Sequence, residues 1–127
     1  MKKDVLAPLA VLAAVLAFCL WNSATMSGHA VRWREQLRRA ESAAREENWP
    51  DAIDALEESH WDWQSRQTYL HVVTGHGAVD EAEAMYRRCM AFAAVQEDSE
   101  FLAELAGLRE RLRLLAEMER FSVRNIL

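Results

Sequence analysis

The sequence predicts an all-α protein with an N-terminal membrane anchor helix, followed by an antiparallel bundle of three or four helices. Only four glycines and two prolines interrupt its 127 residues, so the composition favours helix. One uncharged apolar segment stands at the N-terminus, and apolar residues recur at three- and four-residue steps elsewhere. The sequence contains no run of alternating β-branched residues, the pattern that is typical of a strand. We expect an anchor or signal-like segment at 1–27 and one bundle domain at 28–127.

The N-terminal segment has the length of a short membrane span. Lys2 and Lys3 are followed by 17 residues without a charge, at positions 5–21. This suits a spanning helix or the apolar region of a signal peptide. Gly28 and Ala30 have the small side chains of a cleavage site but lie far downstream of the apolar run, and Phe18 is too bulky for a lipoprotein box before Cys19. We expect an uncleaved single-pass anchor in the cell membrane, with a removed signal peptide as the alternative.

Basic residues lie on both sides of this segment. Lys2 and Lys3 favour a cytoplasmic N-terminus, whereas the arginines after the segment favour the reverse. Because the nearest charges usually dominate, we expect the bulk of the chain to be extracytoplasmic. A basic collar at the lipid headgroups is then predicted to contain Arg32, Arg34, Arg38, Arg39, Arg120 and Arg124.

The remainder of the chain is acidic. Two of the 15 Lys and Arg residues and one of the 20 Asp and Glu residues precede position 23, so the rest has a net charge of −6. We therefore expect no nucleic-acid binding. Cys19 lies in the apolar segment and Cys89 in the remainder, so an intramolecular disulfide is not expected, and Cys89 suits a small buried position.

The first helix of the bundle is expected from about residue 28 to 47 and continues the anchor helix. Its acidic and basic residues alternate at i,i+4, as in the pairs Glu35–Arg39 and Glu41–Arg45. One face carries the apolar or small residues Met26, Ala30, Trp33, Leu37, Ala40 and Ala44.

The second helix is expected to start at Asn48, a good N-cap, with Pro50 in its first turn and its end near residues 74–77. One stripe contains Trp49, Ile53, Leu56, His60, Trp63, Gln67 and Leu70. A second stripe on the opposite side contains Trp61, Thr68 and Val72. A helix with two apolar stripes either touches two neighbours or leaves one stripe for a partner.

Two further helices follow. The third is expected at about 78–96, with Ala82, Met85, Cys89, Phe92, Ala93 and Gln96 on one face. The fourth starts near Asp98 and has a heptad stripe of Phe101, Leu105, Leu108, Leu112, Leu115, Glu119, Ser122 and Ile126. Leu114, Met118 and Phe121 make a second patch on this helix.

Residues 46–63, EENWPDAIDALEESHWDW, combine seven carboxylates with three tryptophans. Most of the carboxylates fall off the apolar stripe, which is typical of a solvated acidic face. Trp61 points away from that stripe, so we expect it to be exposed or to lie between helices. The turn before this helix is expected at the far tip from the membrane. The candidate partner surface is Trp61, Glu46, Glu47, Asp51 and Asp54.

Residues 40–56 resemble the middle of a tetratricopeptide repeat. The repeat has small or bulky apolar residues at the positions of Ala40, Trp49, Ala52, Ile53 and Leu56. Glu47 stands where it prefers Gly. No second copy follows. The resemblance implies a local helix hairpin rather than a repeat array.

A wider resemblance covers nearly the whole chain. The lysine-led anchor, NWPDAIDALEESHWDW, HGAVDEAE and the terminal MERFSVRNIL are similar to a family of short membrane-anchored helical proteins. That family is described as a domain of unknown function and occurs mostly in Gram-positive anaerobic bacteria. The Gly75/Gly77 pair departs from its pattern. The resemblance implies no known activity and no catalytic residues. The matching positions are Trp49, Ala52, Leu56, Trp63, His76, Asn125 and Ile126.

Metal chemistry has two weak signals. Glu57-x-x-His60 has the spacing of di-iron bundles, but those need a second copy, and only Glu119 could add a carboxylate. His76 and Asp80 lie four residues apart, although Gly77 between them argues against a helix there. A core-edge His60 and a helix-capping His76 are the simpler interpretations. We therefore expect no metal and no cofactor.

No motif indicates an enzyme. The sequence lacks Gly-x-Ser-x-Gly, a phosphate-binding glycine loop, and a Cys with a positioned His. We expect a membrane-anchored, extracytoplasmic interaction or structural module with an unidentified protein partner. The alternative is a sensor or a small-ligand or metal-binding bundle.

Overall fold

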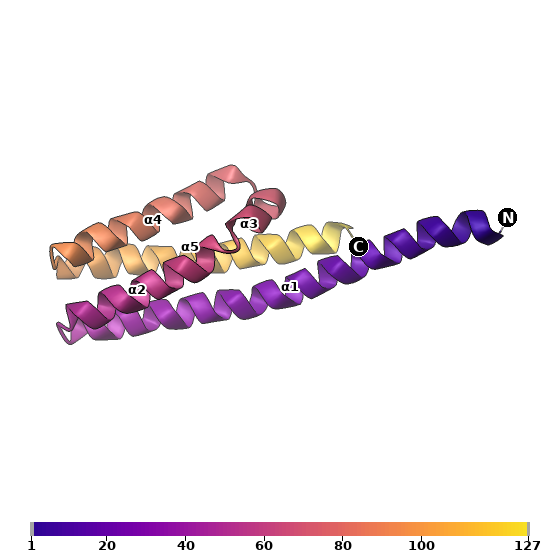
Figure 1. Ribbon diagram of the computed structural model, residues 1–127. Coiled ribbons are helices and arrows are strands. Elements are labelled where there is room, and N and C mark those ends of the chain that lie inside the picture. The colour runs from indigo at the N-terminus through magenta and orange to yellow at the C-terminus, as the bar shows by residue number, and fades with distance from the viewer. Residues whose placement is uncertain (1, 127) are drawn as a thin grey trace.

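The computed structural model describes residues 2–126, except for the side chains at 2–3, 22–30, 72–73, 122–123 and 126. This part of the chain is helical and contains no strand. The helices are α1 (Lys2–Arg45), α2 (Trp49–Gln64), α3 (Gln67–Thr74), α4 (His76–Ala94) and α5 (Asp98–Ile126) (Figure 1). The all-α prediction is confirmed.

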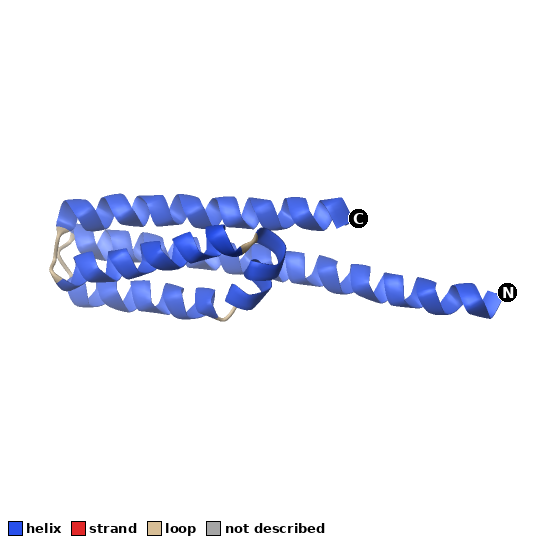
Figure 2. Ribbon diagram, turned by 90° about the horizontal axis from the view of Figure 1, so that it is seen from above, coloured by secondary structure: helices blue, strands red, loops and turns tan. Residues whose placement is uncertain are grey.

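The four long helices form an antiparallel bundle (Figures 1 and 2). α1 packs against α2 and α5, and α4 packs against α5 and α2. The α1–α2 and α4–α5 turns lie together at one end, which we call the tip. At the other end, which we call the base, lie α3 and the C-terminal end of α5, beside α1 where it leaves the bundle.

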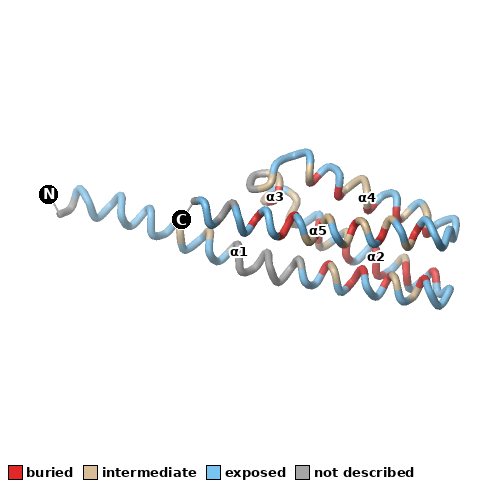
Figure 3. Tube along the Cα trace, turned by 180° about the vertical axis from the view of Figure 1, so that it is seen from behind, coloured by how far each residue is buried: buried red, intermediate tan, exposed pale blue. Residues whose placement is uncertain are grey.

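α1 joins the apolar segment to the bundle without a break. It is one helix of 44 residues and runs through the predicted domain boundary at residues 27 and 28. Its first part, Asp4–Trp21, is apolar and long enough to cross a membrane, and none of it is buried against the bundle (Figure 3). This part protrudes past the base.

Most of the core comes from the predicted stripes, but the predicted face of α4 is partly wrong. Met85 and Phe92 are only half-buried and Gln96 is exposed, whereas Val79 and Tyr86 are buried. Trp33, Leu37, Leu56, Trp63 and Leu70 are fully buried. The α5 heptad is buried throughout its described side chains, at Phe101, Leu105, Leu108, Leu112, Leu115 and Glu119. Stripe positions whose side chains lie outside the description are Met26, Ala30, Val72, Ser122 and Ile126.

The expected second helix is two helices, which corrects the sequence-based boundary. α2 ends at Gln64, and α3 begins at Gln67. The Ser65 hydroxyl donates to the carbonyl of Asp62 at 2.6 Å, and the Arg66 N–H donates to the carbonyl of Trp63 at 3.0 Å. These three-residue hydrogen bonds tighten the chain and end α2 without a Gly or Pro.

The start of α4 is also earlier than expected. Gly75 occupies the N-cap position with φ of 90°, and His76 is the first helical residue. His76 therefore does not cap this helix, and Gly77 lies inside it.

The hairpin resembling a tetratricopeptide repeat is present at the tip, and its turn explains the atypical Glu47. Glu47 has φ of 60°, and the N–H groups of Glu47 and Asn48 donate to the carbonyls of Ala44 and Ala43. This is a Schellman ending, which favours Gly at the left-handed position. Gln96, with φ of 56°, ends α4 in the same way.

Glu47→Gly should stabilise the protein by about 0.5–1 kcal/mol. A left-handed non-glycine residue costs about 1–2 kcal/mol, and the greater freedom of Gly in the unfolded chain offsets part of that gain. Thermal unfolding of the full chain in detergent measures the change. The matched control is Glu46→Gly, where φ is negative and the same substitution should destabilise. A loss of stability in Glu47→Gly would contradict the strained turn.

Candidate functional site

Trp61 is the most exposed large hydrophobic side chain that the structure describes in the bundle. It is 74% exposed, whereas Trp63, two residues later, is fully buried. This confirms the expectation that Trp61 lies outside the core stripe. Around it on α2 lie the exposed residues Asp54, Glu57 and Glu58. We call Asp54, Glu57, Glu58 and Trp61 the α2 outer face.

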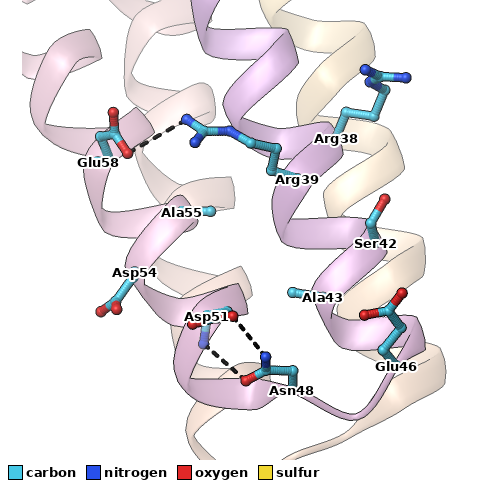
Figure 4. Close-up of a pocket in the computed structure, with 10 residues that line it drawn as sticks. All are labelled: Arg38, Arg39, Ser42, Ala43, Glu46, Asn48, Asp51, Asp54, Ala55 and Glu58. Atoms are coloured by element: carbon cyan, nitrogen blue, oxygen red, sulfur yellow. Dashed lines mark hydrogen bonds and ion pairs between the residues drawn. The ribbon is translucent and has the colours of Figure 1, made fainter.

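The tip residues of the predicted partner surface line a groove between α1 and α2 (Figure 4). The groove has a volume of about 510 Å³, and Arg39 reaches across it to Glu58 at 3.5 Å. Asn48 caps α2 by accepting from the Asp51 N–H. The lining residues are Arg38, Arg39, Ser42, Ala43, Glu46, Asn48, Asp51, Asp54, Ala55 and Glu58.

The five predicted partner residues therefore do not form one patch. Glu46, Asp51 and Asp54 line the tip groove, and Glu47 is exposed in the adjacent turn. Trp61 lies seven residues beyond Asp54, about 10 Å along the helix axis. Asp54 lines the groove and also lies on the same helix face as Trp61, because a seven-residue step returns to the same face.

The six arginines of the predicted collar are also distributed over the bundle. Arg38 and Arg39 line the tip groove, and Arg32 pairs with Asp62 of α2 at 3.2 Å. Arg34 faces α5, where it shares a shallow depression with Arg109 and Glu110. Arg120 and Arg124 lie near the base, where they line a depression with Phe121. The structure thus does not bring these arginines into a single ring.

Most of the α1 arginines are matched by neighbouring carboxylates. Arg38 forms an ion pair with Glu35 at 2.7 Å, and this bond holds the pKa of the Glu35 carboxyl below its ordinary value. Both side chains are exposed, so the pair adds little stability.

Of the residues considered for a di-iron site, His60 and Glu119 have other partners. The Nε2 atom of His60 lies 3.0 Å from both carboxylate oxygens of Glu83 on α4, while Glu57 faces solvent. Glu119 is buried and accepts a hydrogen bond from the Tyr69 hydroxyl at 2.7 Å. Burial, and then this bond to Glu119, raise the pKa of Tyr69.

The second metal signal, the pair His76 and Asp80, does have helical spacing in the structure. Because α4 starts at His76, His76 and Asp80 are one helical turn apart, as chelation requires. The His76 ring lies against His71, with centroids 4.6 Å apart. Within the described side chains, however, no three His, Cys, Asp or Glu residues are grouped to hold a metal.

Sequence reasoning missed a buried polar contact in the middle of the bundle. The hydroxyls of Ser59 and Tyr86 are hydrogen-bonded at 2.8 Å, and the Ser59 hydroxyl donates to the Trp33 carbonyl at 3.4 Å. The contact joins α1, α2 and α4. The signal that could have found it is the 3-4-3-4 stripe of buried residues on α4, Val79, Ala82, Tyr86, Cys89 and Ala93.

The buried polar groups do not resemble a nucleophilic site. Burial raises the pKa of the Cys89 thiol to about 12, so the thiol stays protonated and unreactive at neutral pH. Burial also raises the pKa of Tyr86. Cys89 is therefore a small core residue, as its spacing predicted.

Comparison with known proteins gives one match. The model of a family described as a domain of unknown function (DUF4363) matches residues 21–126. The match begins at Trp21, where the apolar segment ends, and spans the bundle. No curated protein and no solved structure matches the chain.

Proposed function

We propose that this chain, which belongs to the DUF4363 family, is a single-pass membrane protein whose extracytoplasmic bundle docks a protein partner. In this proposal it binds and positions that partner and catalyses no reaction. The exposed apolar segment at Asp4–Trp21 supports the anchor. Lys2 and Lys3 directly before it support a cytoplasmic N-terminus.

The exposure of Trp61 is the observation that carries the partner-binding role. Tryptophan is enriched among the residues that dominate binding energy at protein interfaces, and here it is 74% exposed. Three exposed carboxylates lie in the two turns before it, at Asp54, Glu57 and Glu58, and Glu58 also pairs with Arg39. We infer that the partner presents a basic surface, because a guanidinium can stack on the indole while it pairs with these carboxylates.

The tip groove favours the alternative, a small-ligand or sensor function. Its volume of about 510 Å³ is within the range of about 300–1,000 Å³ for ligand sites. Such sites are mostly apolar, however, and among the described residues that line this groove only Ala43 and Ala55 have apolar side chains. A protein partner therefore fits the surface better.

A photo-crosslinking amino acid at position 61 tests the proposal in cells that express the full chain. We expect an adduct of one defined mass with a protein, and we expect Glu57→Lys with Glu58→Lys to abolish it. The matched control places the crosslinker at Ala103, which is exposed on a different helix, α5.

Two results would contradict docking at the α2 outer face. The first is that the crosslinker forms the same adducts from position 103 as from position 61. The second is an adduct at position 61 that persists after reversal of both charges.

A further inference from the structure

We propose that the last two turns of α5 are a second membrane contact, which binds anionic lipid headgroups beside the anchor. The contact consists of Phe121, Arg120 and Arg124, with Met118 and Leu114 above them. It rests on the membrane anchoring proposed above and adds a lipid-binding surface to the bundle itself.

The antiparallel packing of α1 and α5 sets the height of this contact. Arg109 of α5 pairs with Glu41 of α1 at 2.6 Å, which fixes the register of the two helices. Arg124 lies fifteen residues after Arg109, so it is level with α1 residue 26, about 8 Å past Trp21. Figures 1 and 2 both show the C-terminal end of α5 beside α1 at the base.

The length of the apolar segment brings the base close to the membrane. Its 18 residues span about 27 Å, whereas the hydrocarbon core is about 30 Å thick. A span that is too short draws its flanking residues toward the bilayer. The residues just after Trp21, and the α5 residues level with them, then lie among the headgroups.

Among the described side chains, the arginines of α5 are ion-paired in the middle of the helix but not near its C-terminal end. Arg109, Arg111 and Arg113 each pair with a carboxylate: Arg109 with Glu41, Arg111 with Glu81, and Arg113 with Glu110 and Glu117. Arg120 and Arg124 form no ion pair among the side chains that the structure describes, and both are exposed. Two unpaired arginines on an otherwise acidic bundle are complementary to anionic lipid.

The apolar residues of the contact become more exposed toward the C-terminus. Leu114 is 36% exposed, Met118 42% and Phe121 65%. An aromatic ring flanked by arginines is typical of a helix surface at the membrane interface. Pairing with a second copy of the chain fits less well, because it would bring the unpaired arginines of both copies together.

Spin labelling of the full chain in vesicles tests the contact. Nitroxides are attached to Asn125→Cys, Leu12→Cys or Ala103→Cys in a Cys19→Ala background; the buried thiol of Cys89 does not take the label. The vesicles are phosphatidylcholine with or without phosphatidylglycerol. Accessibility to oxygen and to a water-soluble nickel chelate gives the depth of each label.

We expect the label at 125 to lie at headgroup depth with phosphatidylglycerol and in water without it. Arg120→Gln with Arg124→Gln should shift the docking equilibrium toward water by roughly 30-fold, since each arginine adds about 1 kcal/mol near an anionic surface. The matched control, Arg111→Gln with Arg113→Gln, removes the same charge from paired positions and should leave the depth unchanged.

Three results would overturn the contact. If label 125 is in water while label 12 is in the bilayer, the lipid contact is rejected and the proposed anchor is retained. Labels 12 and 125 both in water would reject the anchor as well. Spin–spin broadening at 125 that disappears on dilution with unlabelled protein would show that a second copy covers this surface.

Discussion

Trp63→Ala is expected to lower the free energy of unfolding by about 3–5 kcal/mol, the cost of deleting a buried aromatic side chain. Trp63 is fully buried, and its ring centroid lies 5.4 Å from that of Tyr86 and 6.3 Å from that of His60. Deleting the indole removes the contact with Tyr86 of α4 and the contact with His60 within α2, and it leaves a cavity.

Trp61→Ala is the matched control for this prediction, because it deletes the same side chain two residues away. Trp61 is 74% exposed, so we expect the midpoint of thermal unfolding to change by no more than about 2–4 °C. The full chain in detergent, followed by circular dichroism, gives both values. Equal, large losses at the two positions would place Trp61 in the core and remove the basis for a docking surface there.

The second large effect is expected on α5. Leu112→Ala should cost about 2–5 kcal/mol, because Leu112 is fully buried in the heptad stripe. Leu114→Ala should cost less, about 1 kcal/mol, because its side chain is 36% exposed. Denaturant unfolding of both variants measures the difference. A loss at Leu114 as large as that at Leu112 would show that the α5 patch is core rather than surface.

The sequence predicted the helices wherever the signal was local and periodic. The 4-3 spacing from Phe101 to Glu119 identified the buried face of α5, and the off-stripe position of Trp61 indicated its exposure. The break between Gln64 and Gln67 was not predicted, because hydrogen bonds of Ser65 and Arg66 make it rather than a Gly or Pro.

The candidate surfaces were predicted less well, because they depend on packing between helices. The arginines of α1 are near the anchor in sequence, but Arg38 is 17 residues past Trp21 and so stands about 25 Å above it on a continuous helix. The pairing of Ser59 with Tyr86 likewise joins residues 27 apart, which no local pattern reveals.

Cysteine labelling in intact cells tests most directly whether the bundle is anchored outside the cytoplasm. Ala103→Cys provides an exposed thiol on α5, in the Cys19→Ala background with Cys89 buried. A membrane-impermeant maleimide should label this position equally before and after the cells are permeabilised. Labelling only after permeabilisation would place the bundle in the cytoplasm and contradict the proposed extracytoplasmic role.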